Sequence, residues 1–172
     1  MTTEQKITEF LKLAALEQVN YDEISKILEV SRKIMTDWEK ENKSEYKKLA
    51  NVRRLYLRKE ITNLTLREFC EWYSFQDRKC FYCDITESDI KKLITQNSIT
   101  TKRLITRGRK LEIDRRRPNL KYDQISNLVL SCYWCNNAKT DEFTDIEFKS
   151  YIAPGIKQIW KDRINKIEQE KW

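Results

Sequence analysis

Two pairs of cysteines are the residues whose type and spacing most directly indicate chemistry. Cys80 and Cys83 form one Cys-x-x-Cys pair, and Cys132 and Cys135 form the second. Two such pairs supply the four thiolates that a structural Zn²⁺ ion binds in tetrahedral geometry. The stretch between the pairs is longer than in a simple zinc ribbon, so we expect further secondary structure between the two cysteine pairs. We predict a zinc site that stabilises this half of the chain; the alternative is four unrelated buried cysteines.

The composition restricts the class of partner and the compartment. The chain has 172 residues, and its 34 Lys and Arg residues outnumber its 27 Asp and Glu residues. A sequence pI of about 9.1 favours a polyanionic partner, with nucleic acid first and an anionic membrane surface second. No apolar run long enough to span a membrane and no signal-peptide pattern occurs. We therefore expect a cytoplasmic protein, because reducing surroundings favour metal-bound cysteines over disulfides.

The first 62 residues have the pattern of packed helices. Glycine and proline are scarce in the chain, with two of each, and apolar residues recur here at helical spacing. Glu29-Val30-Ser31 predicts a tight turn between two short helices, and Ser31 is a good N-cap for the second. This order resembles a helix-turn-helix, whose second helix enters the major groove of DNA. The alternative is two packed helices with no role in nucleic-acid binding. By position, the base-contacting residues would be Arg32, Lys33 and Thr36.

A further helix is expected over residues 46–56. Its basic residues have two alternative roles, phosphate contacts or a solvated face, and position in the sequence does not separate them. These residues are Lys47, Lys48, Arg53, Arg54, Arg58 and Lys59.

The densest positive stretch runs from residue 102 to residue 121. It holds nine basic residues against two acidic ones. Residues 103–106 and 110–113 predict the two arms of a hairpin that turns at Gly108. Such a basic loop suits phosphate contacts. With Lys139 farther along the chain, the predicted nucleic-acid contacts are Lys102, Arg103, Arg107, Arg109, Lys110, Arg116 and Arg117.

The order of elements around the second cysteine pair resembles a known family. A predicted strand ends in Asp114, a loop leads to a second strand beginning at Asn127, and Cys135-Asn136 opens a helix. This order is similar to the ββα-metal fold of HNH endonucleases, in the subgroup with a four-cysteine zinc site, and it covers about residues 78–150. The resemblance implies that Asp114 and Asn136 bind a catalytic Mg²⁺ or Mn²⁺ ion. It also implies that Asn127 ties down the loop between the strands.

The chain departs from this family at the residue after the metal-binding acid. The family has histidine there as the base that activates water, whereas this chain has Arg115 and no histidine anywhere. Arginine cannot act as a base at neutral pH, but it can clamp a phosphate oxygen. The resemblance leaves two possibilities: a purely binding descendant, or a branch of restriction enzymes in which arginine fills this position and a tyrosine replaces the histidine.

A tyrosine would then take part in the chemistry. Tyr122 in the loop is our first candidate, with Tyr82 and Tyr133 in the cysteine knuckles as the others; packing is the alternative role of each, and a phosphate-bound water is the fallback. Asp114 and Asn136 also have structural alternatives, a surface ion pair with Arg115 or Arg116 and a helix N-cap.

These patterns together predict a mostly helical α+β protein. We expect a helix-turn-helix-like region over residues 1–62 and a zinc-clipped ββα-metal domain over residues 63–172. A helix is predicted to open at Thr144, Pro154-Gly155 to interrupt the chain, and an amphipathic helix to follow.

The predicted function is a metal-dependent endonuclease that cuts double-stranded DNA at specific sequences, of restriction or mobile-element type. Because one site cuts one strand, a homodimer is a further expectation. The alternative is a non-catalytic, zinc-containing DNA-binding protein or regulator. A weaker alternative is an RNA nuclease, in which Trp134 and tyrosines would stack on single-stranded bases.

Overall fold

The computed structural model describes residues 1–100 and 107–169, and these form two compact units, Met1–Phe75 and Gln76–Trp172. The boundary lies later than the predicted one, which followed residue 62. The reason is that helix α5 (Leu66–Phe75) packs on helix α4 (Lys43–Arg58) in the first unit. The rings of Tyr56 and Phe69 join them, with their centroids 5.5 Å apart.

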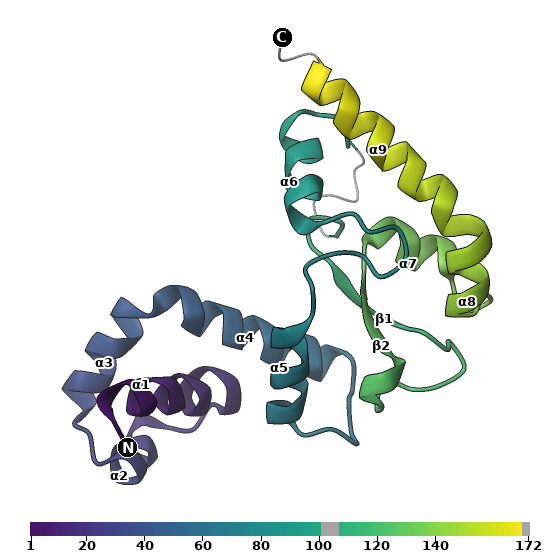
Figure 1. The fold of residues 1–172 in the computed structure, drawn as a ribbon. Coiled ribbons are helices and arrows are strands. Elements are labelled where there is room, and N and C mark those ends of the chain that lie inside the picture. Colours follow the sequence, from purple (N-terminus) through teal and green to yellow (C-terminus); the bar gives the residue numbers. More distant parts are fainter. Residues whose placement is uncertain (101–106, 170–172) are drawn as a thin grey trace. The chain divides into compact units, whose positions relative to one another are not determined.

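The first unit consists of helices (Figure 1). Helix α1 (Thr3–Leu11) continues into the π-helical turn η1 (Lys12–Glu17), and α2 (Tyr21–Leu28), α3 (Arg32–Glu41), α4 and α5 follow. Ser31 caps α3 by accepting a hydrogen bond from the Ile34 backbone N–H. Glu29 ends α2 in the left-handed conformation, with φ of 52°. The two predicted helices and the tight turn between them are therefore present.

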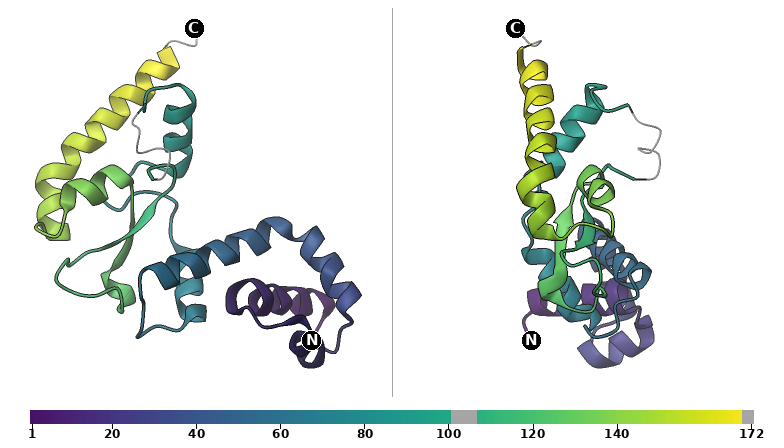
Figure 2. Two further views of the ribbon diagram at one scale, coloured as in Figure 1. Left: turned by 180° about the vertical axis from the view of Figure 1, so that it is seen from behind. Right: turned by 90° about the vertical axis from the view of Figure 1, so that its right-hand side faces the viewer.

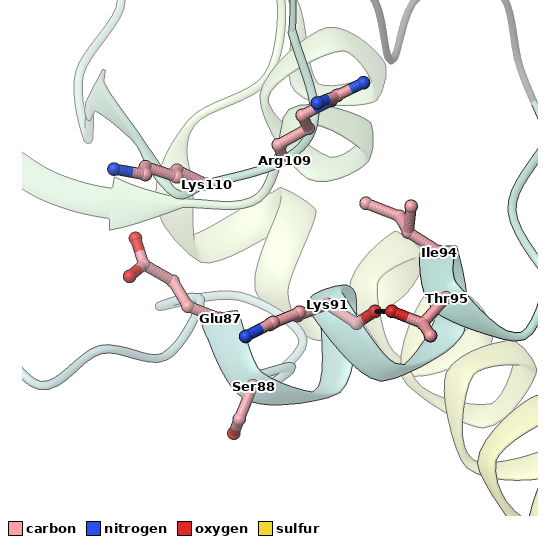
Figure 3. Close-up of a pocket in the computed structure, with 7 residues that line it drawn as sticks. All are labelled: Glu87, Ser88, Lys91, Ile94, Thr95, Arg109 and Lys110. Carbon is pink, nitrogen blue, oxygen red and sulfur yellow. Dashed lines mark hydrogen bonds between the residues drawn. The ribbon is translucent and has the colours of Figure 1, made fainter.

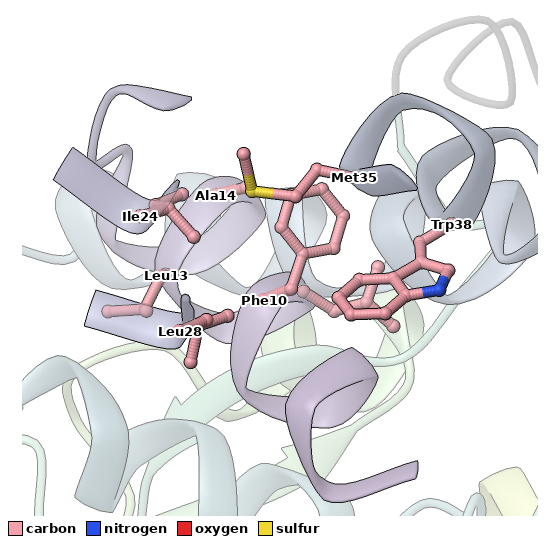
Figure 4. Close-up of a cluster of buried hydrophobic side chains, with 8 residues drawn as sticks. Phe10, Leu13, Ala14, Ile24, Leu28, Met35 and Trp38 are labelled. Carbon is pink, nitrogen blue, oxygen red and sulfur yellow. The ribbon is translucent and has the colours of Figure 1, made fainter. Parts of the chain in front are cut away.

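The core of this unit is a cluster of apolar side chains from α1, η1, α2 and α3 (Figure 4). Phe10 lies at its centre, with its ring 6.0 Å from that of Trp38 and 5.5 Å from that of Tyr21. Burial of such side chains is the main source of stability in a small helical domain. The buried members of the cluster are Phe10, Leu11, Leu13, Ala14, Ile24, Leu28, Met35 and Trp38.

The second unit is built around one small antiparallel sheet (Figures 1 and 2). Strand β1 (Glu112–Arg115) pairs with β2 (Leu128–Ser131), with Asp114 opposite Val129. The short helix η3 (Ile125–Asn127) precedes β2, and α7 (Tyr133–Lys139) follows it and packs on β1. The order strand, loop, strand, helix is that of a ββα unit. Together with the first unit, it confirms the predicted α+β, mostly helical class.

Two further helical elements flank the ββα unit. Helix α6 (Glu87–Thr95) begins with a capping box between Thr86 and Asp89. It runs beside α9 (Ala153–Gln169), as both figures show, and Lys92 Nζ lies 2.6 Å from Glu168 Oε1. None of the described helices is long and apolar enough to cross a bilayer.

The predicted interruption at Pro154-Gly155 was wrong. Helix α8 (Asp145–Glu147), the π-helical turn η4 (Phe148–Ile152) and α9 form one continuous run, with Pro154 inside α9. A proline in a helix lacks its own N–H and crowds the carbonyl four residues earlier. The wider π turn immediately before Pro154 relieves that crowding, because its hydrogen bonds span five residues, as from Ala153 N to Phe148 O.

Candidate active site

The four cysteines of the two pairs come together in the second unit. All four side chains are buried, and their sulfur atoms lie within 4.8 Å of one another. Cys83 Sγ and Cys132 Sγ are 3.7 Å apart. Four sulfurs around a zinc ion in tetrahedral geometry, each about 2.3 Å from the metal, would be separated by about 3.8 Å. The cluster can therefore hold a metal ion such as zinc.

The surrounding backbone fixes this cluster to the ββα unit. Phe81, inside the first pair, donates its backbone N–H to Leu130 O on β2 at 2.8 Å. Cys132 is the N-cap of α7, and its sulfur accepts from the Cys135 N–H at 3.4 Å. Hydrogen bonds from the other thiols, that of Cys132 foremost, lower the pKa of the Cys80 thiol. Its thiolate, the form that binds metal, is thereby favoured.

A row of polar side chains lies where α7 packs on β1. Glu112 and Asp114 are two residues apart on the strand, so they point to the same side of it. Asn136 and Lys139 are three residues apart on the helix and likewise share a face. Asn136 Nδ2 donates to Glu112 Oε2 at 2.8 Å, and Lys139 Nζ lies 3.6 Å from Asp114 Oδ2. The facing elements thus bring both predicted metal ligands to one interface, where Asp114 lies beside Lys139 and Asn136 beside Glu112.

Two hydrogen-bond donors and a nearby cation contact the carboxylate of Asp114. The Tyr82 hydroxyl donates to Oδ2 at 2.8 Å, the Arg115 backbone N–H donates to Oδ1 at 2.8 Å, and the Lys139 ammonium lies beside Oδ2. Asp114 is only 6% exposed. A buried carboxylate needs such partners to remain ionised.

Lys139 was predicted to contact nucleic acid, and the structure corrects this. Its residue surface is only 1% exposed, and its ammonium lies between Asp114 and the backbone oxygen of Thr140. A lysine buried in this way cannot reach a phosphate. Its charge is instead directed at the predicted metal ligand.

The three candidate tyrosines have different surroundings. Burial, and then the charge of Asp114, raise the pKa of Tyr82 above its usual range, and its hydroxyl donates to that carboxylate. Tyr82 therefore holds Asp114 and is unsuited to accept a proton. The ring of Tyr122 lies 5.1 Å from the guanidinium carbon of Arg115, and that of Tyr133 lies 4.9 Å from the guanidinium carbon of Arg107.

Arg115, at the end of β1, is held at three points. Nη2 is 2.7 Å from Asp141 Oδ1, Nη1 donates to Leu120 O at 3.2 Å, and the guanidinium stacks on Tyr122. The Asp141 side chain is 83% exposed, so this ion pair lies at the surface. A surface ion pair of this kind is weak, and a phosphate group can compete for the guanidinium.

The loop between the strands is organised by Asn127, which is buried. Its Oδ1 accepts from the Arg117 N–H at 2.8 Å, and its Nδ2 donates to Arg117 O at 3.3 Å and Lys121 O at 3.2 Å. Arg116 Nε is 2.7 Å from Asp145 Oδ2, and the side chains of Arg116 and Arg117 are both exposed. The loop therefore presents two exposed arginines, and the first of them is paired with an acid.

The predicted basic hairpin is described only in part, because Lys102, Arg103 and the rest of residues 101–106 lie outside the described residues. Gly108 has φ of 84°, a conformation that favours glycine. Arg107 makes two hydrogen bonds to Glu112, which raise the pKa of its guanidinium. Arg109 and Lys110 line an open hollow together with Glu87, Ser88, Lys91, Ile94 and Thr95 of α6 (Figure 3).

The predicted base-contacting residues of the first unit lie at the start of α3. Arg32 and Lys33 are exposed, and Arg32 Nη1 is 3.8 Å from Asp22 Oδ1. Thr36 is half-buried, and its hydroxyl donates to Arg32 O at 2.9 Å. Two of the three side chains are therefore accessible to a partner.

Sequence reasoning missed Glu112, the buried role of Lys139 and the contact between Tyr82 and Asp114. The spacing of Glu112 and Asp114 carried a usable signal, because residues i and i+2 of a strand share a face. The contact of Tyr82, which joins residues 32 positions apart, had no such local signal.

No family model and no curated protein matches the chain. Among solved structures, the chain is similar to the rare-cutting HNH restriction endonuclease PacI, with a TM-score of 0.48 and 26% sequence identity. The similarity covers 66% of this chain and 76% of that one.

Proposed function

We propose that this protein is a metal-dependent DNA endonuclease of the HNH type. The observation that carries the proposal is the β1–α7 interface, where Asp114 lies beside Lys139 and Asn136 pairs with Glu112, next to the four-cysteine cluster. Arg115 follows Asp114 directly and supplies a cation next to these oxygen ligands. Acidic ligands beside an arginine suit a phosphodiester substrate.

The four cysteines would bind a structural zinc ion. Their sulfur spacing fits tetrahedral coordination of a single ion, which is the geometry of a four-cysteine zinc site. Zinc requires the thiols to stay reduced, which agrees with the expected cytoplasmic location.

A catalytic Mg²⁺ or Mn²⁺ ion would be held by Asp114 and Asn136. Both residues offer the oxygen ligands that these hard cations prefer. Asn136 uses its Nδ2 to donate to Glu112, so its Oδ1 is the atom left to bind an ion. When bound, the ion would stabilise negative charge on the phosphate and the leaving oxygen. Glu112 would act as a positioning residue, because it orients the Asn136 amide.

Arg115 would bind a non-bridging oxygen of the scissile phosphate. Its present partner Asp141 is exposed, and exchange of that carboxylate for a phosphate would keep the guanidinium stacked on Tyr122. Tyr122 remains our candidate for the base; its hydroxyl must first release its own proton to solvent, and the resulting phenolate would then take the proton from the attacking water. Tyr82 is assigned to holding Asp114, since its own proton is committed to that carboxylate.

Double-stranded DNA is the proposed substrate, cut at specific sequences. The exposed Arg32 and Lys33 at the start of α3, in a helix-turn-helix-like pair, would supply base contacts, and the basic residues 107–117 would supply phosphate contacts. A homodimer would allow both strands to be cut.

The proposal is tested by incubating the purified protein with supercoiled plasmid in Mg²⁺ or Mn²⁺ and then adding EDTA. We expect metal-dependent nicking that falls at least a thousandfold in Asp114→Asn. The matched control is Asp162→Asn, which removes an exposed carboxylate on α9. Because Asp114→Asn leaves the Lys139 charge unpaired, Asp114→Asn/Lys139→Met is tested alongside it, with zinc content as the check on folding. A protein that binds DNA tightly but cuts no substrate in either metal contradicts the proposal.

A second candidate is a zinc-containing DNA-binding protein without catalysis. The observation in its favour is that Asp114 is buried beneath two hydrogen-bond donors and the Lys139 ammonium, in a chain without histidine. Isothermal titration with Mn²⁺ separates the two: the enzyme binds the ion with an affinity that Asn136→Ala weakens, whereas the binding protein shows no such site.

A further inference from the structure

We propose that helix α4 is a phosphate-binding surface that anchors the first unit to the backbone of duplex DNA. The inference deepens the proposed function and rests on it for the identity of the polyanion. It starts from four exposed basic residues on α4, Lys43, Lys47, Arg54 and Arg58, which we call the α4 basic stripe.

The spacing of the α4 basic stripe puts its members on one face of the helix. Their separations are four, seven and four residues. At about 100° per residue, all four fall within about 60° around the helix axis. Lys43 and Lys47 are one turn apart, as are Arg54 and Arg58, so the stripe consists of two pairs of cations.

The opposite face of α4 is packed against the unit's own core. Val52 is buried, and Tyr46 and Leu49 pack on the apolar cluster of α1 to α3. The Tyr56 ring packs at a tilt against Phe69, and its hydroxyl donates to Leu64 O at 2.6 Å. These contacts hold the helix at its inner side, so the α4 basic stripe is presented by a fixed element.

The charge of the stripe is not compensated by neighbouring acids. The only acidic residue of α4 is Glu45, which lies on another side of the helix and pairs with Lys48 at 2.8 Å. Within residues 1–100 and 107–169, none of the four stripe residues forms an ion pair; Arg54 donates to the amide oxygen of Asn51. Four uncompensated cations in a row attract a polyanion.

The contrast with α2 and α3 strengthens the assignment. Those helices mix both signs, and two of their cations, Arg32 and Lys40, lie within 4 Å of Asp22 and Asp37. A polyanion gains less from such a surface than from a row of cations. Base contacts by α3 would therefore require a separate anchor, which α4 provides.

The dimensions of the stripe fit a duplex. From residue 43 to residue 58 the helix rises about 22 Å, at about 1.5 Å per residue. The major groove of B-DNA is about 12 Å wide. The two pairs of cations can therefore reach phosphates on both sides of one groove.

An anionic membrane would also attract cations, but α4 does not suit that partner. A helix that lies in the membrane interface buries an apolar face in the lipid. The apolar face of α4 is already occupied by the core of its own unit. The observations thus favour DNA, and the membrane becomes one outcome of the test.

The test measures binding of the full chain to a labelled duplex by fluorescence anisotropy, without Mg²⁺ so that no cutting occurs, over a range of KCl concentrations. The stripe variant carries Lys47→Gln, Arg54→Gln and Arg58→Gln. The control variant carries Lys26→Gln, Lys40→Gln and Lys48→Gln, which remove the same charge from other exposed positions of the unit. Glutamine keeps a high helix propensity, and circular dichroism checks the fold.

We expect the negative slope of log K against log [KCl] to become shallower by about 2 to 3 in the stripe variant, since each lost phosphate contact removes about 0.9 from its magnitude. The control variant should keep the wild-type slope. Equal slopes in the two variants would overturn the proposal, as would a wild type that binds anionic phosphatidylserine vesicles through the stripe but not DNA.

Failure of this inference can be told apart from failure of the proposed function. If the wild type binds duplex through the stripe but never nicks plasmid, the α4 surface stands and the nuclease assignment fails. If the protein nicks plasmid and the stripe variant keeps the wild-type slope, the nuclease stands and the α4 surface fails.

Discussion

The two units of this chain are stabilised in different ways. The first has a cluster of apolar side chains around Phe10, and its charges lie at the surface. Among the described residues, all the buried polar and charged side chains belong to the second unit. They are Asp114, Asn127, Ser131, Lys139 and Asp145, and the four buried cysteines lie in the same unit.

The difference concerns the free energy of burying charged side chains, which the second unit does and the first does not. Burying a charge such as that of Asp114 or Lys139 is unfavourable unless it is well paired, and a hydrophobic pair of similar size often gives a more stable fold. The four-cysteine cluster, once it held a metal ion, would offset this cost by linking strand, knuckle and helix. The first unit buries no charged side chain, and in our proposal its role is to bind DNA.

The largest expected effect comes from removing the metal clip. Cys132→Ser should unfold the second unit while the helices of the first remain, because structural zinc contributes on the order of 10 kcal/mol to small domains. Hydrogen exchange, read separately for residues 1–75 and 76–172, measures this. The matched control is Cys70→Ser, which removes a cysteine outside the cluster. Persistent protection in the second unit would show that its apolar residues suffice.

The next largest effect should come from a cavity in the first unit. Phe10 is fully buried at the centre of the cluster, so Phe10→Ala should lower the free energy of unfolding of this unit by about 4 kcal/mol. Zinc content should stay unchanged. Phe10→Ala would thus destabilise the first unit alone, as Cys132→Ser should destabilise the second unit alone. Loss of zinc in Phe10→Ala would mean that the two units do not fold independently.

Breaking the buried ion pair should cost slightly less. Lys139→Met leaves the Asp114 carboxylate without its cation and should destabilise the second unit by about 3 kcal/mol. Adding Asp114→Asn should recover most of that loss, which urea denaturation of the single and double variants measures. If the double variant is as unstable as Lys139→Met, the loss of stability does not come from the unpaired Asp114 carboxylate.

A smaller effect is expected at Tyr82. Tyr82→Phe removes a hydrogen bond to a charged group and should cost about 2 kcal/mol. Because Tyr82 positions Asp114, the Mg²⁺ concentration for half-maximal nicking should rise about tenfold. Tyr122→Phe, in contrast, should lower the nicking rate at saturating Mg²⁺. The opposite pattern would assign the chemical role to Tyr82.

The smallest effects should be alike in both units. Ser31 caps α3 and Thr86 caps α6, each through a side-chain oxygen that accepts from a backbone N–H. Ser31→Ala and Thr86→Ala should each cost about 1 kcal/mol in thermal denaturation. Unequal losses would show that one of these helices is held mainly by its tertiary contacts.

The sequence by itself determined the features that depend on short spacings. Ser31, Thr86 and Thr144 mark the starts of three helices, because a cap acts within one turn. The two Cys-x-x-Cys pairs predicted one buried cluster, and the order of elements around Asp114 predicted the ββα unit. The cap signals act between residues close in sequence. The cysteine signal requires only that the four thiols bind one ion.

Only the tertiary structure decided which side chains meet across distant elements. Lys139 follows a cysteine knuckle and looks like a surface cation, yet the packing of α7 on β1 buries it beside Asp114. The sequence offered Tyr82 as one of three candidate tyrosines. In the structure its knuckle packs on β2, which brings its hydroxyl to that same carboxylate. Such partners depend on how elements far apart in sequence pack, and residue spacing along one element contains no information about that packing.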